Sequence, residues 1–202
     1  MIRYAGLFLG TYMVAAVPFG YLIGRAGGVD VRRRGSGNIG ATNLLRTRGK
    51  VAGILTLLLD AAKGAVPVTA AHALFPAEPW VPVAAGFVAV AGHCFSLYMR
   101  FHGGKGVATA VGAFLALDPL VAAGAVSVFT LVVAWTRLVA LGSTIFASAL
   151  PGIAWLLGTP ELALGSIPIA IVIVWRHREN LARIRSGTED RLGSRRATGE
   201  GP

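Results

Sequence analysis

Residues 35–43 read Gly-Ser-Gly-Asn-Ile-Gly-Ala-Thr-Asn and lie between two long apolar runs, residues 4–24 and 51–75. The three glycines permit positive φ angles and close approach of the backbone, so successive N–H groups can converge on one oxyanion. Polar side chains in the stretch add further donors: Ser36, Asn38, Thr42 and Asn43. Three arginines, residues 32–34, precede it. The stretch therefore predicts an anion site at the surface of a membrane.

The composition of the whole chain indicates a membrane protein. Of its 202 residues, 54% are hydrophobic and only 14% are charged, and the mean hydropathy is +0.66. The net charge of +10 comes from short basic clusters between apolar runs, where they attract anionic lipid headgroups, so we expect no nucleic-acid partner. The single cysteine, Cys94, excludes an internal disulfide, and we predict neither a metal nor a cofactor.

The apolar runs predict an all-α, polytopic membrane helix bundle with about seven transmembrane helices. Residues 1–185 form its single domain, and residues 186–202 are predicted to be a polar, basic, disordered tail. The first run lacks a signal-peptide cleavage pattern and is interpreted as a retained helix with a kink at Pro18 and Gly20. The expected crossings are residues 4–24, 51–75, 80–98, 106–117, 120–135, 138–157 and 162–175. If residues 106–135 form a re-entrant hairpin instead, five crossings remain.

The distribution of lysine and arginine predicts the orientation. If the basic loop of residues 25–50 is inside, strict alternation also places Arg100, Lys105, Arg137 and the tail inside. The outer turns, residues 76–79, 118–119 and 159–161, then contain no lysine or arginine. The prediction is an N-out, C-in protein whose polar loops converge at the cytoplasmic face.

Two glycine motifs resemble nucleotide-binding fingerprints, and neither has the required context. Gly35-x-Gly37-x-x-Gly40 with Asp60 downstream matches the dinucleotide pattern, but the run before it is long enough to span a bilayer and is no strand. Residues 103–106, Gly-Gly-Lys-Gly, lack the serine or threonine of a P-loop. We expect this glycine pair to expose backbone N–H groups at the start of a helix beside Lys105. The alternative is a plain turn whose lysine reaches lipid headgroups.

Other polar residues allow both structural and functional interpretations. His177 and Asn180 share one face of a helix, where they bind substrate or lipid phosphate. Asp60 and Lys63, one turn apart in an apolar run, are predicted to be a structural ion pair. Ser143 either donates to an anion or bonds to its own helix.

Known catalytic motifs of soluble enzymes are missing from the sequence. It contains no His-x-x-x-x-Asp pair of the acyl-CoA acyltransferase type and no Gly-x-Ser-x-Gly elbow. His93 is interpreted as a packed, hydrogen-bonded histidine.

Three blocks of sequence nevertheless resemble the bacterial acyl-phosphate:glycerol-3-phosphate acyltransferase family. They are residues 35–43 with Arg46 and Gly49, residues 92–109, and Arg176-His177 with Asn180, Arg183, Gly187 and Glu189. Residues 59–64, with Asp60 and Lys63, also fit the pattern. Two positions depart from it, because Ser96 stands where the family usually has proline and His102 where it usually has lysine.

The resemblance implies transfer of a fatty acyl group from acyl phosphate to the 1-hydroxyl of glycerol 3-phosphate, giving 1-acyl-glycerol 3-phosphate and phosphate without a covalent acyl-enzyme. The enzyme is expected to be a monomer in the bacterial cytoplasmic membrane, in contact with lipids. The residues expected to hold acyl phosphate are Ser36, Gly37, Thr42, Gly103, Gly104 and Ser143. Those expected to hold glycerol 3-phosphate are Asn38, Asn43, Arg46, Lys105, His177 and Asn180.

Within these sets His177, Lys105 and Ser36 are the expected catalytic residues. The proton acceptor stays open between His177 and a substrate phosphate. Glu189 is expected to pair with Arg183 or Arg185 and to brace the start of the tail. A transporter for small anions or lipid phosphates is the alternative function, although the chain shows no internal repeat of the kind common in transporters.

Overall fold

The computed structural model describes residues 1–193, which form ten α-helices and two 3-10 helices and no strand. Their bounds are α1 Ile2–Ala15, α2 Phe19–Ala26, η1 Val31–Arg33, α3 Ala41–Arg48, α4 Lys50–Leu74, α5 Trp80–Cys94, η2 Leu97–Met99, α6 Val107–Leu117, α7 Pro119–Thr136, α8 Val139–Leu157, α9 Pro160–Arg176 and α10 Arg178–Arg185. The predicted all-α class is confirmed. Part of the tail predicted to be disordered, residues 194–202, lies outside this description.

Five segments are long and apolar enough to cross a membrane: Ile2–Ala26, Lys50–Leu74, Trp80–Met99, Pro119–Thr136 and Val139–Leu157. Large apolar side chains point outward along these helices, among them Leu58, Leu131 and Trp155. In water such a surface would be a liability, whereas in lipid it is the expected exterior. The chain is a multi-pass membrane protein, and seven crossings and an N-out orientation stay predictions.

The structure corrects the sequence prediction at two places near the N-terminus. The first apolar run is two helices, because α1 ends before Pro18 and α2 begins after it. The predicted loop of residues 25–50 contains η1 and α3, and Gly49 ends α3 with a φ of 85°. Helix α3 is short and polar, so it lacks the apolar periodicity by which a helix is recognised.

Two buried side chains complete the backbone hydrogen bonds at the break between α1 and α2. Lys63 Nζ donates to the Val17 carbonyl at 2.8 Å, and Ser96 Oγ donates to the Ala16 carbonyl at 2.5 Å. Helix ends inside a bilayer need such partners because lipid offers none. A proline at position 96 could not make this side-chain bond, so Ser96 has a structural role specific to this sequence.

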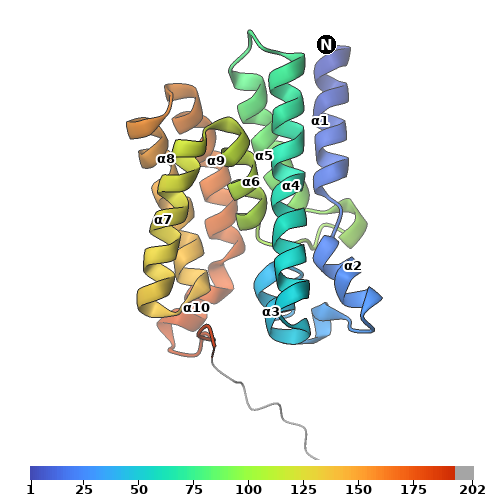
Figure 1. Ribbon diagram of the computed structural model, residues 1–202, viewed down its shortest axis with the longest axis vertical. Coiled ribbons are helices and arrows are strands. Elements are labelled where there is room, and N and C mark those ends of the chain that lie inside the picture. The colour runs from blue at the N-terminus through green and yellow to red at the C-terminus, as the bar shows by residue number, and fades with distance from the viewer. Residues whose placement is uncertain (194–202) are drawn as a thin grey trace, which may run out of the picture.

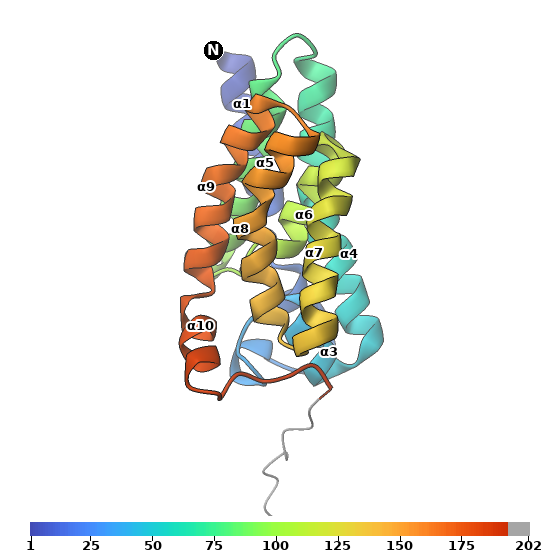
Figure 2. The ribbon, with the colours of Figure 1, turned by 90° about the vertical axis from the view of Figure 1, so that its left-hand side faces the viewer.

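The helices run along one long axis and divide into two groups (Figures 1 and 2). Helices α1, α4 and α5 pack together on one side, α7, α8 and α9 on the other, and α6 lies between them. Helices α2, α3 and α10 gather at the end of the bundle opposite the N-terminus (Figure 1). The largest core cluster is built from Phe114, Phe146, Leu150, Ile169 and Ile173.

Helices α4 and α6 pack closely because each has a glycine at the contact. A Cβ on Gly112 would lie 1.8 Å from the Ala61 carbonyl oxygen, and a Cβ on Gly64 would lie 2.1 Å from that of Thr109. Small residues that let backbones approach are typical of helix contacts in membranes. This contact positions the first turn of α6, which carries part of the site described below.

Gly112→Ala is therefore expected to destabilise the protein. Overpacking costs about 1–3 kcal/mol, which for a chain of this size lowers the melting temperature by about 5–10 °C. The measurement is thermal unfolding of the purified protein in detergent. Gly152→Ala in α8 is the matched control, because a Cβ there meets nothing within 4 Å. Equal melting temperatures for the two variants would contradict the close-packing argument.

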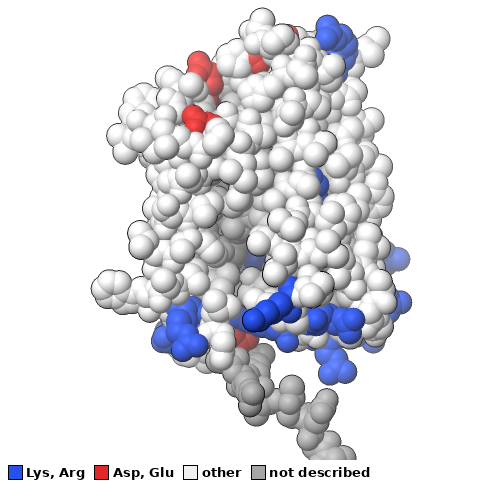
Figure 3. Space-filling view, viewed as in Figure 1, with Lys and Arg blue, Asp and Glu red and all other residues white. Residues whose placement is uncertain are grey.

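Charged side chains are distributed unequally between the two ends (Figure 3). Lysine and arginine gather around the end formed by α2, α3 and α10, and several acidic residues lie at the opposite end. On the same face a recess opens above the basic end (Figure 3).

Candidate active site

A cavity of about 470 Å³ opens between α3, α4, α6, α7, α8 and α10. Its charged and polar lining includes Arg46, Lys105, His177, Asn180 and Arg183. Its larger apolar lining residues are Leu57, Val107, Val111, Val126, Phe129, Val139 and Phe146. Three carboxylates, Asp60, Glu189 and Asp190, also line it, so one cavity joins a charged, polar part to an apolar part.

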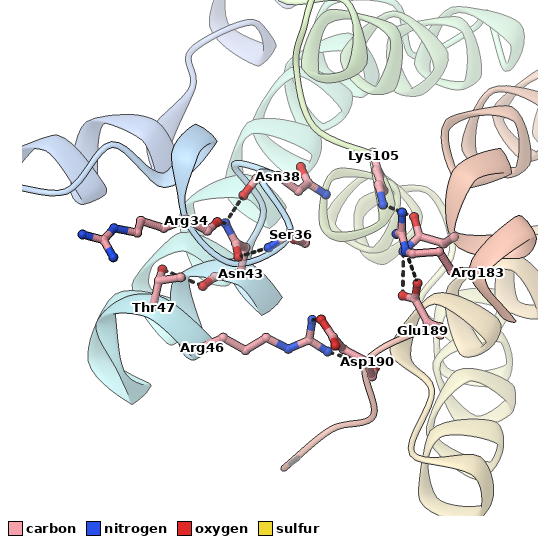
Figure 4. A network of polar contacts seen from close by, with 11 residues as sticks. Arg34, Ser36, Asn38, Asn43, Arg46, Thr47, Lys105, Arg183, Glu189 and Asp190 are labelled. Atoms are coloured by element: carbon pink, nitrogen blue, oxygen red, sulfur yellow. Dashed lines mark hydrogen bonds and ion pairs between the residues drawn. The ribbon is translucent and has the colours of Figure 1, made fainter. Parts of the chain in front are cut away.

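The glycine-rich stretch forms one wall, and the buried Asn43 side chain organises it (Figure 4). Asn43 Nδ2 donates to the carbonyls of Val31, Arg34 and Asn38 at 3.0, 3.1 and 2.8 Å. Its Oδ1 accepts from the Ser36 N–H at 3.0 Å. Both polar atoms of the Asn43 side chain are hydrogen-bonded to the loop, so Asn43 holds the loop in this conformation.

The structure corrects the expectation that successive N–H groups converge on an anion in the glycine turn of this loop, because three of them are already bonded within the protein. The N–H of Ser36 is bonded to Asn43, that of Gly37 to the Arg34 carbonyl, and that of Gly40 to Asn38 Oδ1. Gly37, at a φ of 72°, belongs to the turn and does not line the cavity. The loop instead presents side chains of Ser36, Asn38 and Thr42 and the first turn of α3, whose N–H groups have no partner within the helix.

The second glycine pair also differs from the sequence expectation. The N–H groups of Gly103 and Gly104 donate to the carbonyls of Cys94 and His93, both at 3.1 Å. Their own carbonyls accept from Arg176, whose Nη2 and Nε lie at 2.7 and 3.0 Å. These glycines therefore expose no free N–H and lie behind the cavity wall. The available donors come one turn later, from the start of α6 at Gly106, Val107 and Ala108, which do line the cavity.

Lys105 reaches from this second loop toward α10. Its Nζ donates to Asn180 Oδ1, and Asn180 Nδ2 donates to Glu189 Oε1 at 2.6 Å. Glu189 Oε2 accepts from Arg183 Nε at 2.7 Å. Burial lowers the pKa of Lys105 to about 8, with the Glu189 carboxylate opposing that shift. The network in Figure 4 holds a partly desolvated ammonium group in the cavity wall.

His177 is buried at the junction of α9 and α10. Its Nδ1 lies 2.8 Å from the Ile173 carbonyl, which can only accept, so Nδ1 carries the proton and Nε2 has the free lone pair. Burial, helped by the charges of Lys105 and Arg176, lowers the pKa of this imidazole to about 4, and the hydrogen bond to the Ile173 carbonyl opposes that shift. His177 is thus neutral at physiological pH.

The chain after α10 contributes Glu189 and Asp190 to the cavity lining and runs past Arg46 (Figure 4). Arg46 of α3 donates to the Asp190 carbonyl at 3.2 Å and lies 3.6 Å from its carboxylate. Further along, the Leu192 N–H donates to the Arg137 carbonyl at 2.6 Å. Residues 186–193, predicted to be disordered, have a defined path here because these contacts join α3, α10 and the turn between α7 and α8.

Ser143, Asp60 and Lys63 complete the set of predicted residues. Ser143 lines the cavity, and its Oγ donates to the Val139 carbonyl at 2.9 Å, so it offers a ligand its lone pairs. Lys63 Nζ lies 3.0 Å from Asp60 Oδ1, and both side chains are almost fully buried. Asp60 also lines the cavity, whereas Lys63 does not.

Three residues of the site have roles that the sequence motifs did not reveal. Arg176 holds both glycine carbonyls, Arg183 lines the cavity, and His93 lines it beside Asp60. Arg176 and Arg183 lie in a basic segment at a helix end, and such a segment is equally typical of a helix end that only contacts lipid headgroups. His93 follows an apolar run, so nothing in the local pattern separates a cavity residue from a packed one.

Together the fold and the cavity define a membrane protein with a site whose lining is polar and charged in one part and apolar in another. A family model described as Glycerol-3-phosphate acyltransferase matches residues 5–187, and the chain belongs to this family. It is an integral membrane acyltransferase of phospholipid synthesis.

Relatives and solved structures agree with this assignment. The glycerol-3-phosphate acyltransferases of Geobacter sulfurreducens and Trichlorobacter lovleyi are 48% and 47% identical over 183 and 194 residues. The alignments cover 90% and 93% of this chain and 94% and 98% of the relatives. Crystal structures of PlsY (YgiH), an integral membrane glycerol 3-phosphate acyltransferase, in glycerol 3-phosphate and lysophosphatidic acid forms, superpose with TM-scores of 0.90 and 0.88 at 36% identity. Each covers 95% of this chain and 96% of the other.

Proposed function

We propose that the protein moves a fatty acyl group from an acyl phosphate to the 1-hydroxyl of glycerol 3-phosphate. The 1-oxygen forms a bond to the acyl carbonyl carbon, the bond from that carbon to the phosphate oxygen breaks, and the products are 1-acyl-glycerol 3-phosphate and phosphate. The observation that carries this proposal is a cavity in which Arg46, Lys105 and polar groups meet an apolar lining. Both substrates carry phosphate, and one carries an acyl chain. The solved glycerol 3-phosphate and lysophosphatidic acid forms of the relative support it.

Two groups of residues divide the phosphate binding in this proposal. Arg46, Lys105 and Asn180 bind the phosphate of glycerol 3-phosphate, since they converge from α3, the loop before α6 and α10. Ser36, Thr42 and Ser143, with the first turns of α3 and α6, surround the acyl phosphate. Helix N-termini stabilise negative charge, which grows on the carbonyl oxygen and the leaving phosphate during transfer. Asn43, Gly103 and Gly104 act indirectly, by fixing the two loops.

The phosphate of the acyl donor is the proposed proton acceptor. An efficient base has a pKa near the working pH, and a His177 pKa of about 4 makes that imidazole a weak one. A phosphate group, with a second pKa of about 6, is better matched. His177 is then a neutral polar group of the cavity wall and not the base. An acyl phosphate is already activated, which removes the need for a covalent acyl-enzyme.

The reaction is proposed to occur at the cytoplasmic face of the bacterial plasma membrane by a monomer. The cavity mouth lies at the end where lysine and arginine gather (Figure 3), and cytoplasmic loops carry an excess of both.

The donor is tested with purified protein in detergent, glycerol 3-phosphate and either palmitoyl phosphate or palmitoyl-CoA. Released phosphate and acylated product are followed together. Product from palmitoyl phosphate alone is the expected result. Product from palmitoyl-CoA alone would overturn the donor assignment, and product from neither in folded protein would overturn the reaction.

The activity is expected to fall at alkaline pH as Lys105 loses its charge. With a pKa of about 8 in the free enzyme, Lys105 is mostly charged at pH 7 and mostly neutral at pH 9. The value of kcat/KM for glycerol 3-phosphate should therefore fall by about tenfold per pH unit above pH 8. Stability changes in the opposite direction, because the unfolded chain holds this proton more tightly and so the free energy of unfolding rises between pH 8 and the unfolded pKa of about 10.4.

The control for this pH profile is Lys105→Arg, because a guanidinium group stays charged across the range. Whatever activity this variant retains should show no fall between pH 8 and 9.5. An identical alkaline fall in the variant and the original protein would exclude Lys105 as its cause.

A further inference from the structure

Arg176 is the last residue of α9 and does not line the cavity, yet its side chain contacts the loop that carries Lys105. Its Nη2 and Nε donate to the carbonyls of Gly103 and Gly104 at 2.7 and 3.0 Å. Two donors of one planar guanidinium group therefore fix two successive peptide groups. Because Arg176 lies outside the cavity lining, any effect that it has on a bound ligand must pass through another residue.

The peptide groups of the two glycines are bonded on both sides. Their N–H groups donate to the last carbonyls of α5, those of Cys94 and His93, and their own carbonyls accept from Arg176. A Cβ on Gly103 would lie 2.0 Å from the His93 carbonyl oxygen, so the loop is in direct contact with α5. The ends of α5 and α9 thus hold the loop between them.

Only two side chains in the described part of the protein bond to residues 103–106, and they are those of Arg176 and Asn180. Asn180 accepts from Lys105 Nζ. Both residues belong to one continuous segment, the end of α9 and the α10 helix that follows it. This segment is therefore attached to the loop twice, at the backbone before Lys105 and at the Lys105 side chain itself.

Arg178, two residues after Arg176, behaves as a basic residue at a helix end ordinarily does. Its side chain is exposed, lies 4.4 Å over the Trp175 ring and donates to the Trp175 carbonyl at 3.3 Å, all within its own segment. Arg176 instead bonds to a loop that is distant in sequence. The two arginines thus offer a comparison between a residue that joins two parts of the site and one that does not.

We infer that Arg176 is a positioning residue, which holds Lys105 in the geometry that binds the phosphate of glycerol 3-phosphate. The inference rests on the proposed function and assigns Arg176 no contact with substrate. Lys105 directly follows Gly104, so the direction in which its side chain leaves the loop depends on the peptide group that Arg176 holds. A binding group that is held in place before its ligand arrives loses little conformational freedom on binding.

The test is Arg176→Met, which keeps an apolar stem and removes both bonds to the loop. With palmitoyl phosphate as donor, kcat/KM for glycerol 3-phosphate should fall by at least about tenfold, because a small displacement of a binding group can cost about 10²-fold. The loss should appear in the same parameter, KM or kcat, as in Lys105→Met, since both substitutions act on one ammonium group. A smaller fall, or a loss in the other parameter, would overturn the inference.

A double-mutant cycle separates positioning of Lys105 from general weakening of the structure. When Lys105→Met is already present, no ammonium group remains to be positioned, so adding Arg176→Met should lower kcat/KM by less than about threefold. A second loss as large as the first would show that Arg176 acts independently of Lys105. That result would also overturn the inference.

Arg176→Lys distinguishes the paired donors of the guanidinium group from its charge. Lysine keeps the charge, but its ammonium group cannot hold two carbonyls in one plane. This variant should recover only part of the activity and stay at least about threefold below the original protein. Full recovery would mean that a positive charge alone is required, and the positioning role would be excluded.

Arg178→Met is the matched control, because Arg178 lies in the same segment and bonds only within it. It should change kcat/KM by less than about twofold, as expected for an exposed charge. An equal fall in Arg178→Met and Arg176→Met would show that loosening of the segment after α9 explains the effect, which contradicts the inference.

If a folded variant is inactive, thermal stabilisation by glycerol 3-phosphate replaces the kinetic comparison, because it reports affinity for the folded protein. Reduced stabilisation in Arg176→Met, with no further reduction in the double variant, supports the inference, and undiminished stabilisation overturns it. If Arg176→Met does not fold, Arg176→Lys takes its place in the cycle with Lys105→Met. Failure of the proposed function is a separate result, namely no acyl transfer by the original protein from either donor.

Discussion

Lys105→Met is expected to lower kcat/KM for glycerol 3-phosphate by about 10²–10³-fold, with little change in the melting temperature. Methionine keeps the length and apolar character of the lysine stem and removes the ammonium group. A charge-assisted bond to a phosphate, made where water is largely excluded, contributes about 1.5–3 kcal/mol, and a group that also stabilises charge in the transition state contributes somewhat more. Lys105 fits that description because it is partly buried, lines the cavity and bonds to Asn180.

Lys50→Met is the matched control for this substitution. Lys50 begins α4, is exposed and does not line the cavity. The same loss of charge there should change kcat/KM by less than about twofold, since a solvated surface charge contributes little. Similar losses in both variants would mean that net charge at the membrane surface, rather than the local contact, governs activity.

The kinetics of Lys105→Met should also separate binding from chemistry. If the ammonium group binds the acceptor phosphate only, KM rises and kcat is retained. If it also stabilises the leaving phosphate, kcat falls as well. Steady-state rates at several concentrations of both substrates distinguish these results.

The membrane helices could be predicted from sequence, because their signal is long-range and cumulative. A run such as residues 51–75 is apolar over its whole length, and no local detail alters that. Helix α3 escaped such prediction, and the break at Pro18 was predicted only as a kink, for a related reason. Both are short, and their stability comes from contacts with distant parts of the chain, such as the bond from Ser96 to the Ala16 carbonyl.

The sequence could predict which loops form the candidate site, but not how their groups are oriented. Composition indicated two glycine-rich loops and a basic helix end, and the structure brings all three to one cavity. Glycine content alone could not show where the N–H groups point. Gly103 and Gly104 do let the backbone approach closely, but they pack against the last carbonyl groups of α5 and not against a ligand. The same ambiguity hid His93, whose role depends on which helix packs beside it.

Asn43 lines the cavity with a side chain whose polar atoms are all bonded within the protein, and its substitution is expected to cost as much activity as loss of a ligand-binding group. Asn43→Asp is nearly isosteric and keeps the oxygen that accepts from Ser36. It loses the donor that reaches three carbonyls, and it places a second carboxylate oxygen against them. Each buried polar group left unpaired costs about 1–3 kcal/mol, so the loop should leave its present conformation.

We therefore expect Asn43→Asp to lower kcat/KM by about 10²–10³-fold while the helix bundle stays folded, since several kcal/mol would be needed to keep the loop in place. Faster tryptic cleavage at residues 32–34 should accompany the loss, because the loop that carries these exposed arginines is released. Thr47→Val is the control on the same helix. It removes only a bond from Thr47 Oγ1 to the Asn43 carbonyl, and it should change kcat/KM by less than about threefold. The prediction fails if Asn43→Asp keeps more than a tenth of the activity and is cleaved no faster. The four bonds of this side chain would then not determine the loop conformation, and the anion site would depend on the helix ends alone.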